Sequence, residues 1–400
     1  MAREQIDRWA PWVIGNLFIV ALFARDILSF DNGLVTTQAY WGRDFINVWT
    51  SGHLLLEGKL HILYDVGAYH QYSQQLFGAI GQHNFSYPPL VLPLMAPFAM
   101  MPYPLALGLW TILTGVLFVV AVRPWWPREL SAPVWLAVLT PAALVNIWAG
   151  HYGFLIGALF LFAWKGLAEG RQVRAGALIG LMVIKPHLAV LFPLVLAIRR
   201  EWTAFFVAGA TVTSLIAIST AVFGVPLWAE YLTVTSGVQA TMIDAGDSFF
   251  RFMTTSLATG LLQMGFPYAL AIGVQALLAI SAIVVVGIVA KREAAHDVMP
   301  VMATGTFLVL PYAFNYDLTV VAVVAFLLVV TRQLNGWEQR LAIGGFAAAQ
   351  FGMVLNSLGL PGIPLLLIGL FVVQCRVLYR RDVLRSDLIQ LPRKTLSAQN

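Results

Sequence analysis

Long, uninterrupted apolar stretches recur along the whole chain, and this repetition constrains the fold more than any other feature of the sequence. A helix needs about 20 apolar residues to cross the roughly 30 Å hydrocarbon core of a bilayer. Strands of a membrane barrel instead alternate between apolar and polar residues over about ten positions. The sequence therefore predicts an all-α, polytopic membrane protein. About twelve transmembrane helices are expected, near residues 11–28, 104–122, 133–149, 152–168, 175–185, 187–198, 202–223, 267–290, 298–313, 317–331, 341–357 and 361–378.

The composition supports the same fold class. Charged residues make up 11% of the 400-residue chain and the mean hydropathy is +0.79, whereas soluble domains carry about 25% charged residues. No small-x-small cleavage pattern follows the first apolar stretch, so we interpret it as a retained helix rather than a signal peptide. The single cysteine, Cys375, excludes an internal disulfide or a cysteine-based metal cluster.

The distribution of basic residues predicts the orientation. Cytosolic loops of membrane proteins are enriched in Lys and Arg. If the N-terminus is inside, most of the 24 lysines and arginines fall in inner segments, so both termini are expected in the cytosol. The net charge of +5 is then a consequence of orientation, and no nucleic-acid partner is expected. The apolar stretch 88–101 is too short to span and is bounded by prolines, so it is expected to be re-entrant or interfacial.

A single domain is expected over residues 1–378, followed by a basic, disordered cytosolic tail at 379–400. Two outer loops are long, at about 29–87 and 224–265. In the first, Phe45–Glu57 and Tyr69–Phe77 have apolar residues at helical spacing. They predict amphipathic helices that lie on the membrane surface or above a cavity.

Lys185 lies inside the apolar stretch LMVIKPHLAVLF, where a charge is costly and usually functional. The proline that follows it breaks the helix. Non-helical backbone at membrane depth is tolerated only when it is buried in protein or lines a water-filled cavity. The sequence therefore predicts a polar cavity, open to the outside, with Lys185 and His187 near its floor.

Other unusual polar residues fall on the same outer side in the predicted topology. The full set is Arg43, Asp44, Tyr87, His151, Lys185, His187, Arg251, Asn315, Tyr316 and Asp317. Carboxylates, histidines and cations around one cavity favour a site that binds an anionic group and moves a proton. Structural roles stay open: Asp44 as a helix N-cap, the histidines as packing residues, Tyr87 as part of a rigid Tyr-Pro-Pro turn, and Asn315 and Asp317 as turn caps.

Five segments of the chain, over roughly residues 40–330, resemble glycosyltransferase family 87 in their order and spacing. They are Asp44-Phe45 with Trp49, Gly52 and LLLEGKLHILYD, then FSYPPLVLPLMAPFAMMPYPLA, GHYGFLIGALF, GLMVIKPHLAVLFPL and LPYAFNYDLTVV. The resemblance implies a GT-C fold and inverting mannosyl transfer from polyprenyl-phosphate-mannose at the outer face, with Asp44 as general base. The chain departs from the family pattern at His151, where Gln is more usual, and at Asn315-Tyr316-Asp317, where histidines occur.

A lipid-linked donor of this kind assigns roles to the polar set. Lys185, Arg251 and Arg43 would bind the donor phosphate. The sugar or the acceptor would be contacted by His151, His187, Tyr87, Asn315, Tyr316 and Asp317. No Asp-x-Asp pair lies near Asp44, so no metal and no cofactor besides the donor are expected; Asp244 and Asp247 are a weaker metal candidate. The expected partners are membrane lipids, the polyprenyl-phosphate sugar and a lipid or glycan acceptor, in a bacterial inner (plasma) membrane.

Other classes of function fit some of these features. A transporter of an anionic or lipid-linked substrate would also place Lys and His inside the membrane, but its two halves usually carry corresponding broken helices. Only one broken pair, at Pro186, is apparent in the sequence. A lipid-linked glycan ligase or a non-catalytic scaffold are further alternatives. The residues identify neither the sugar nor the acceptor, and they leave the organism and the oligomeric state open.

Overall fold

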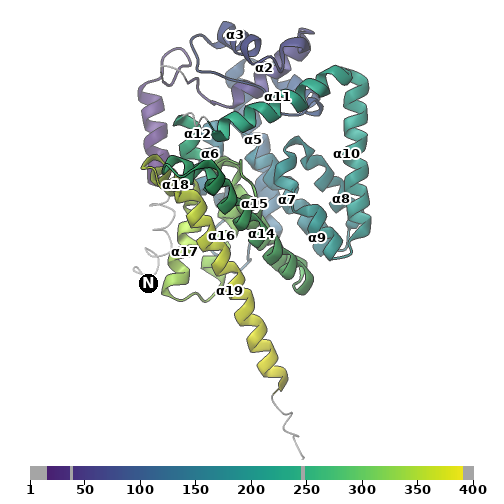
Figure 1. The fold of residues 1–400 in the computed structure, drawn as a ribbon, viewed down its shortest axis with the longest axis vertical. Coiled ribbons are helices and arrows are strands. Elements are labelled where there is room, and N and C mark those ends of the chain that lie inside the picture. The colour runs from purple at the N-terminus through teal and green to yellow at the C-terminus, as the bar shows by residue number, and fades with distance from the viewer. Residues whose placement is uncertain (1–15, 37–38, 245–247, 391–400) are drawn as a thin grey trace, which may run out of the picture.

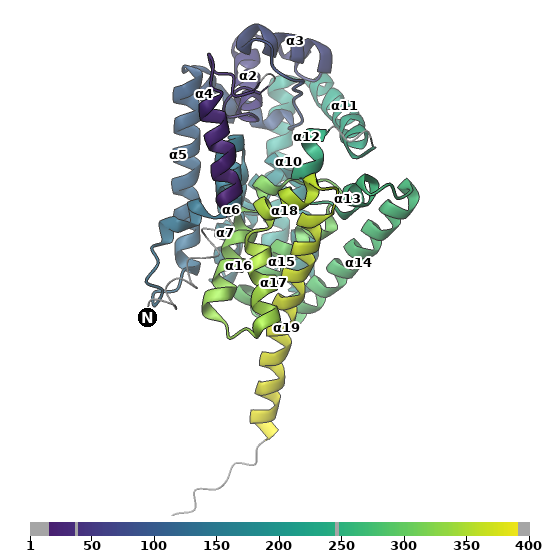
Figure 2. The ribbon, with the colours of Figure 1, turned by 90° about the vertical axis from the view of Figure 1, so that its left-hand side faces the viewer.

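The computed structural model describes residues 16–36, 39–244 and 248–390, and within these ranges every regular element is helical. β-pairing there is limited to isolated bridges. The all-α class is therefore confirmed. The helices form an elongated bundle, with α2, α3 and α11 at one end and the last helix, α19, projecting from the other (Figures 1 and 2).

The helices follow one another along the whole chain. A first helix covers residues 16–28. The others are α2 Phe45–Leu56, η1 Leu60–Ile62, α3 Val66–Phe77, η2 Pro89–Val91, α4 Leu92–Ala99, α5 Tyr103–Val122, η3 Arg123–Trp125, η4 Val134–Leu139, α6 Pro141–Ala149, α7 Gly153–Ala168, α8 Gln172–Leu181, η5 Met182–Ile184, η6 Pro186–Ala189, α9 Phe192–Ile198, α10 Trp202–Phe223, α11 Val225–Asp244, α12 Ser248–Met253, α13 Leu257–Gln263, α14 Tyr268–Arg292, α15 Ala295–Val309, η7 Asn315–Asp317, α16 Thr319–Thr331, α17 Gly336–Phe346, α18 Ala348–Ser357 and α19 Gly362–Gln390.

Four of the helices in the described ranges are long and apolar enough to cross a membrane. They are Tyr103–Trp125, Trp202–Phe223, Tyr268–Arg292 and Gly362–Arg381. The other predicted spans are also helical but are shorter or divided. For example, the stretch 133–149 divides at Thr140, whose hydroxyl accepts a hydrogen bond from the backbone N–H of Ala143 and so starts a new helix. A count of twelve full spans stays a prediction.

Exposure differs strongly between the central and the peripheral helices. Most residues of α7 and α15, and the first eight residues of α16, are buried. By contrast, only 6% of the most apolar window of α10 is buried, and 22% of that of α14. A long helix that is apolar on all sides and yet exposed is stable only in lipid. The chain is thus an integral membrane protein with α10 and α14 at its periphery.

The helices α2, α3 and α11, which we call the cap, cover one end of the bundle (Figure 1). α2 packs on α4, the short apolar stretch, because Gly52 leaves room for Ala99 and for the carbonyl of Met95. α3 begins three residues earlier than predicted, since the side chain of Asp65 caps it by accepting from Ala68. The loop expected at 224–265 also contains helices, of which α11 is the longest.

Ion pairs connect helix ends at the opposite end of the bundle, which we call the basic end. Arg381 of α19 pairs with Glu293 and Asp297, next to α14 and in α15. Arg376 and Arg380 both pair with Glu338, which is fully buried at the start of α17. α19 itself runs to Gln390, so the basic tail expected from residue 379 starts within this helix, and its disorder stays a prediction. Residues 391–400 lie outside the described ranges.

Candidate functional site

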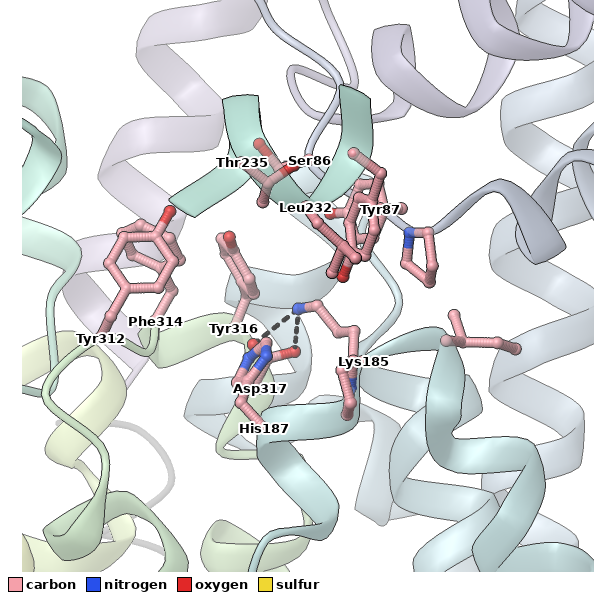
Figure 3. A pocket seen from close by; sticks show the side chains of 14 residues that line it. Ser86, Tyr87, Lys185, His187, Leu232, Thr235, Tyr312, Phe314, Tyr316 and Asp317 are labelled. Carbon is pink, nitrogen blue, oxygen red and sulfur yellow. Dashed lines mark hydrogen bonds and ion pairs between the residues drawn. The ribbon is translucent and has the colours of Figure 1, made fainter. Parts of the chain in front are cut away.

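A cavity of about 280 Å³ lies beneath the cap, where four separate segments of the chain meet (Figure 3). The segments are the end of the first long loop, the interruption after α8, the helix α11, and the turn before α16. The lining residues are Ser86, Tyr87, Pro88, Ile184, Lys185, Pro186, His187, Tyr231, Leu232, Thr235, Tyr312, Phe314, Tyr316 and Asp317. Three of them, Tyr87, Lys185 and Asp317, carry the polar contacts described below, and Tyr316 contributes its ring.

Lys185 reaches the cavity because the helix stops there. Its backbone has φ −133° and ψ 74°, outside the helical region, between the short helices η5 and η6. Pro186 occupies the first position of η6, where its missing N–H is not needed for a helical hydrogen bond. The polypeptide is thus interrupted at the position that the Lys-Pro pair predicted, and the interruption aims the lysine side chain into the protein.

The ammonium group of Lys185 lies 2.8 and 2.7 Å from the two carboxylate oxygens of Asp317. The two side chains are only 5% and 1% exposed. The same nitrogen lies 3.3 Å from Nδ1 of His151, and it sits over the ring of Tyr316 at 5.0 Å from the centroid. A charge so well desolvated is tolerated only when it is paired, and Asp317 is the pairing group.

His151 connects this ion pair to Tyr87. Its Nε2 lies 2.6 Å from the hydroxyl oxygen of Tyr87. Its ring stacks on Tyr316 with 3.9 Å between centroids and an interplanar angle of 23°. Tyr152, the next residue, packs against the ring of Tyr87 at 4.7 Å. Aromatic rings therefore pack on both His151 and Tyr87, and the His151 side chain is only 3% exposed.

Two glycines let the turns that carry these residues approach one another. Gly150 has φ +63°, and a Cβ there would lie 2.7 Å from the carbonyl oxygen of Gly42 and from Cβ of Phe45. Gly153 touches the turn that carries Tyr316 and Asp317. A Cβ added at Gly153 would lie 2.2 Å from the carbonyl oxygen of Tyr316. Larger residues would separate the turns, so these glycines set the spacing of the site.

Asp44 lies at the start of α2, beside the Gly150 turn. It occupies the N-cap position but makes no capping hydrogen bond. Within the described residues its carboxylate forms no hydrogen bond or ion pair. Burial raises the pKa of Asp44 to about 6, Lys185 and Arg43 oppose the shift, and Asp317 adds to it. Asp44 is not among the residues that line the cavity, but its carboxylate is within electrostatic range of the Lys185–Asp317 pair.

Arg43 does not line the cavity and pairs with Asp26. Its guanidinium lies 2.7 Å from a carboxylate oxygen of Asp26, which also accepts from Nε1 of Trp148 at 2.8 Å. The guanidinium also stacks over the Trp148 ring at 3.9 Å. Arg43 itself has φ +41°, a left-handed conformation that is unusual for a residue with a side chain. The ion pair holds this strained turn, and the turn carries Asp44.

The remaining predicted residues are distributed around the cavity. His187 lines it, whereas Arg251 and Asn315 do not. Arg251 ends near α18, where Asn356 donates to its carbonyl oxygen. Asn315 is fully buried and donates to the carbonyl oxygen of Ala349, also in α18. Both are thus in contact with α18.

The sequence reasoning missed the contribution of α11, from which Tyr231, Leu232 and Thr235 line the cavity. The signal available was the i, i+4 spacing of Tyr231 and Thr235, two polar side chains on one helical face. Tyr312 and Phe314 were also missed. Within the described ranges no three His, Cys, Asp or Glu side chains are grouped to hold a metal ion. Of the weaker candidate pair, Asp244 is the last residue of α11, and Asp247 lies outside the described residues.

Comparison with known proteins identifies one family. The family model for glycosyltransferase family 87 matches residues 85–311, more than half of the chain. The matched part contains Tyr87, His151, Lys185 and His187 but ends before Asp317, and it begins after Asp44. No curated protein and no solved structure matches the chain. The chain belongs to glycosyltransferase family 87, and it is a membrane glycosyltransferase.

Proposed function

We propose that this protein transfers a sugar, mannose by family resemblance, from a polyprenyl-phosphate carrier to a lipid or glycan acceptor. The transfer takes place at the cap, and Asp44 is the general base. One observation carries the proposal: a carboxylate with no protein partner among the described residues interacts electrostatically with the buried lysine in the cavity wall. An unpaired base beside a cation is what acceptor activation and phosphate binding require together.

The four long apolar helices support an orientation with the cap outside. Each carries its basic residues at the end away from the cap. These are Arg123 after α5, Arg199 and Arg200 before α10, Lys291 and Arg292 at the end of α14, and Arg376, Arg380 and Arg381 in α19. Under the positive-inside rule this end faces the cytosol, so the cavity opens toward the other face of the bacterial inner membrane.

The reaction requires one proton transfer and one displacement. The acceptor hydroxyl oxygen attacks the anomeric carbon while its proton passes to Asp44. A carbon–oxygen bond forms to the acceptor, and the bond from the anomeric carbon to the phosphate oxygen breaks. The electron pair leaves with polyprenyl phosphate, whose charge increases from about −1 to −2. Attack from the opposite side inverts the anomeric carbon.

Lys185 is the cation best placed for the growing charge on the leaving phosphate. It lines the cavity and is buried, so its field is weakly screened. The electrostatic interaction strengthens as the phosphate gains charge, so it favours the transition state over the bound substrate. In this proposal Arg43 serves Asp44 through its ion pair with Asp26, and Arg251 is left for the part of the donor beyond the cavity. The isoprenoid tail lies between lipid-exposed helices, and no metal takes part.

The decisive experiment measures transfer and donor binding separately. The protein in nanodiscs is incubated with radiolabelled polyprenyl-phosphate-mannose and a crude lipid and glycan extract. We expect label transfer by the wild type and a loss of about 10²–10⁴-fold for Asp44→Asn, with donor binding retained. Asp65→Asn, which removes a carboxylate that only caps α3, is the matched control. Equal transfer by Asp44→Asn would remove Asp44 from the chemistry, and no donor binding by the wild type would remove the donor assignment.

A further inference from the structure

Four polar side chains form a continuous series from Asp317 through Lys185 and His151 to Tyr87, and we call this series the relay. The Nζ atom of Lys185 lies 2.7 and 2.8 Å from the two carboxylate oxygens of Asp317. The next distances are 3.3 Å from Lys185 to His151 and 2.6 Å from His151 to Tyr87. Every member of the relay except His151 lines the cavity.

The chemistry of the first two groups fixes the direction of their hydrogen bonds. A carboxylate only accepts, and a lysine ammonium only donates, through three hydrogens. The ammonium group donates to the carboxylate of Asp317 and to Nδ1 of His151. Since an ammonium cannot accept, Nδ1 of His151 is the acceptor of this bond.

The direction continues through the imidazole. Because Nδ1 of His151 accepts, the proton of the neutral ring lies on Nε2. Nε2–H then donates to the hydroxyl oxygen of Tyr87, so the single hydroxyl hydrogen of Tyr87 is not used in this bond. Since Tyr87 lines the cavity, that hydrogen is available to an acceptor atom within it.

The position of Tyr87 is fixed before any ligand binds. Its backbone carbonyl accepts from the hydroxyl of Tyr64 at 2.6 Å. The two prolines that follow restrict the backbone, and the ring packs on Tyr152. A donor held this firmly loses little conformational entropy on binding, and this favours recognition of one particular atom.

We propose that the hydroxyl group of Tyr87 donates a hydrogen bond to a non-bridging phosphoryl oxygen of the lipid-linked donor, and that His151 is the positioning residue that turns this hydroxyl into a donor. The assignment replaces the sugar- or acceptor-binding role expected for Tyr87 and rests on the proposed function. The positive charge of Lys185 polarises both links of the relay. Lys185 acts on the phosphate through its positive charge, and Tyr87 adds a directed hydrogen bond.

The first test measures binding of a polyprenyl phosphate that carries no sugar. Hydrogen bonds to charged groups contribute enough that Tyr87→Phe should weaken binding about 10–100-fold. Tyr268→Phe, which removes a half-exposed hydroxyl at the start of α14, should bind like the wild type. A loss seen only with the sugar-bearing donor would assign Tyr87 to the sugar and overturn the proposal. Unchanged binding of both ligands by Tyr87→Phe would overturn it as well.

The second test separates positioning from packing. His151→Gln keeps one N–H donor and one acceptor, whereas His151→Phe keeps neither. We expect His151→Phe to weaken polyprenyl phosphate binding as much as Tyr87→Phe, and His151→Gln to weaken it less. In the Tyr87→Phe background, His151→Phe should cause no further loss, because both changes remove the same contact. Additive losses would contradict the relay.

A third measurement needs no substrate and so distinguishes failure of the relay from failure of the proposed function. The tautomer of His151 is determined from imidazole ¹⁵N and ¹³C shifts, assigned by comparison with His151→Gln. Protonation at Nε2 supports the relay, and protonation at Nδ1 would reverse its direction and overturn the inference. If the tautomer is as expected but the wild type binds no polyprenyl phosphate, the donor assignment fails and the phosphate contact fails with it.

Discussion

The ammonium nitrogen of Lys185 lies within 2.8 Å of both carboxylate oxygens of Asp317, although 132 residues separate them in the sequence. One comes from a broken helix and the other from the turn before α16. Their side chains are 5% and 1% exposed. The pair therefore joins two distant parts of the chain at the cavity, and solvent screens its charges only weakly.

Removing only one partner of this pair should be costly. Lys185→Met leaves the Asp317 carboxylate buried without its cation, and such changes destabilise by about 3–5 kcal/mol. The double variant Lys185→Met/Asp317→Asn should recover part of this loss. Denaturant unfolding in detergent measures both. Lys59→Met is the control, because its pair with Glu57 is about half exposed and contributes at most about 1 kcal/mol. Equal effects of Lys185→Met and Lys59→Met would contradict the prediction.

Transfer should depend on pH through Asp44. Burial raises the pKa of this carboxyl to about 6, and a general base works only when it is ionised. The rate should be level above about pH 7 and fall about tenfold per unit below the pKa. Single-turnover transfer, measured with saturating donor, gives the profile. Asp65→Asn should keep the same acid limb. A profile that stays level down to about pH 5 would exclude Asp44 as the base whose pKa is raised.

Adding one methyl group at Gly150 should reduce transfer. Gly150→Ala would place Cβ 2.7 Å from the carbonyl oxygen of Gly42 and push away the turn that carries Asp44. A displacement of about 1 Å costs about 10²-fold in rate. Gly58→Ala is matched to it, since Gly58 has φ +69° but no atom within 4 Å of the added Cβ. It should lose only about 1–2 kcal/mol of stability. Similar transfer by the two variants would show that the close approach at Gly150 is unimportant.

Arg43 offers a test of positioning against phosphate binding. Arg43→Met removes the guanidinium from Asp26 and releases the left-handed turn before Asp44. We expect a lower rate of transfer, unchanged donor affinity and a loss of about 1.5–3 kcal/mol in stability. Arg25→Met, which removes a half-exposed arginine from the same aspartate, should cost about 1 kcal/mol or less. Weaker donor binding by Arg43→Met would instead support a phosphate contact.

Much of the fold could be predicted because lipid imposes one simple requirement on the sequence. Each apolar stretch became a helix, and the bounds of α5, α10 and α14 differ from the predicted ones by a few residues at most. The positions at which one apolar stretch divides into two helices could not be predicted from hydropathy. The break at Ala347 between α17 and α18 has no proline, and the preceding Gly344 and Gly345 weaken the helix without fixing the residue at which it ends.

The candidate site could be predicted at positions where a charged residue stands inside an apolar stretch, because burying such a charge in a membrane costs free energy. Lys185 in an apolar stretch is such a case, and Pro186 marked the interruption. The partner of a charge was not predictable, because it depends on packing between distant turns. Arg43 and Asp317 looked alike as outer-side charges, yet one pairs with Asp26 away from the cavity and the other with Lys185 in its wall.

The junction between α10 and α11 has a mechanical consequence. α10 has 22 residues and would be about 33 Å long, close to the thickness of the hydrocarbon core. It continues through the single residue Gly224, with φ +86°, into α11, whose side chains line the cavity. A helix in a thinner bilayer tilts to keep its apolar length covered. The acyl-chain length of the surrounding lipid should therefore change the position of α11 and the shape of the cavity. Turnover measured in nanodiscs of graded thickness should change with acyl-chain length.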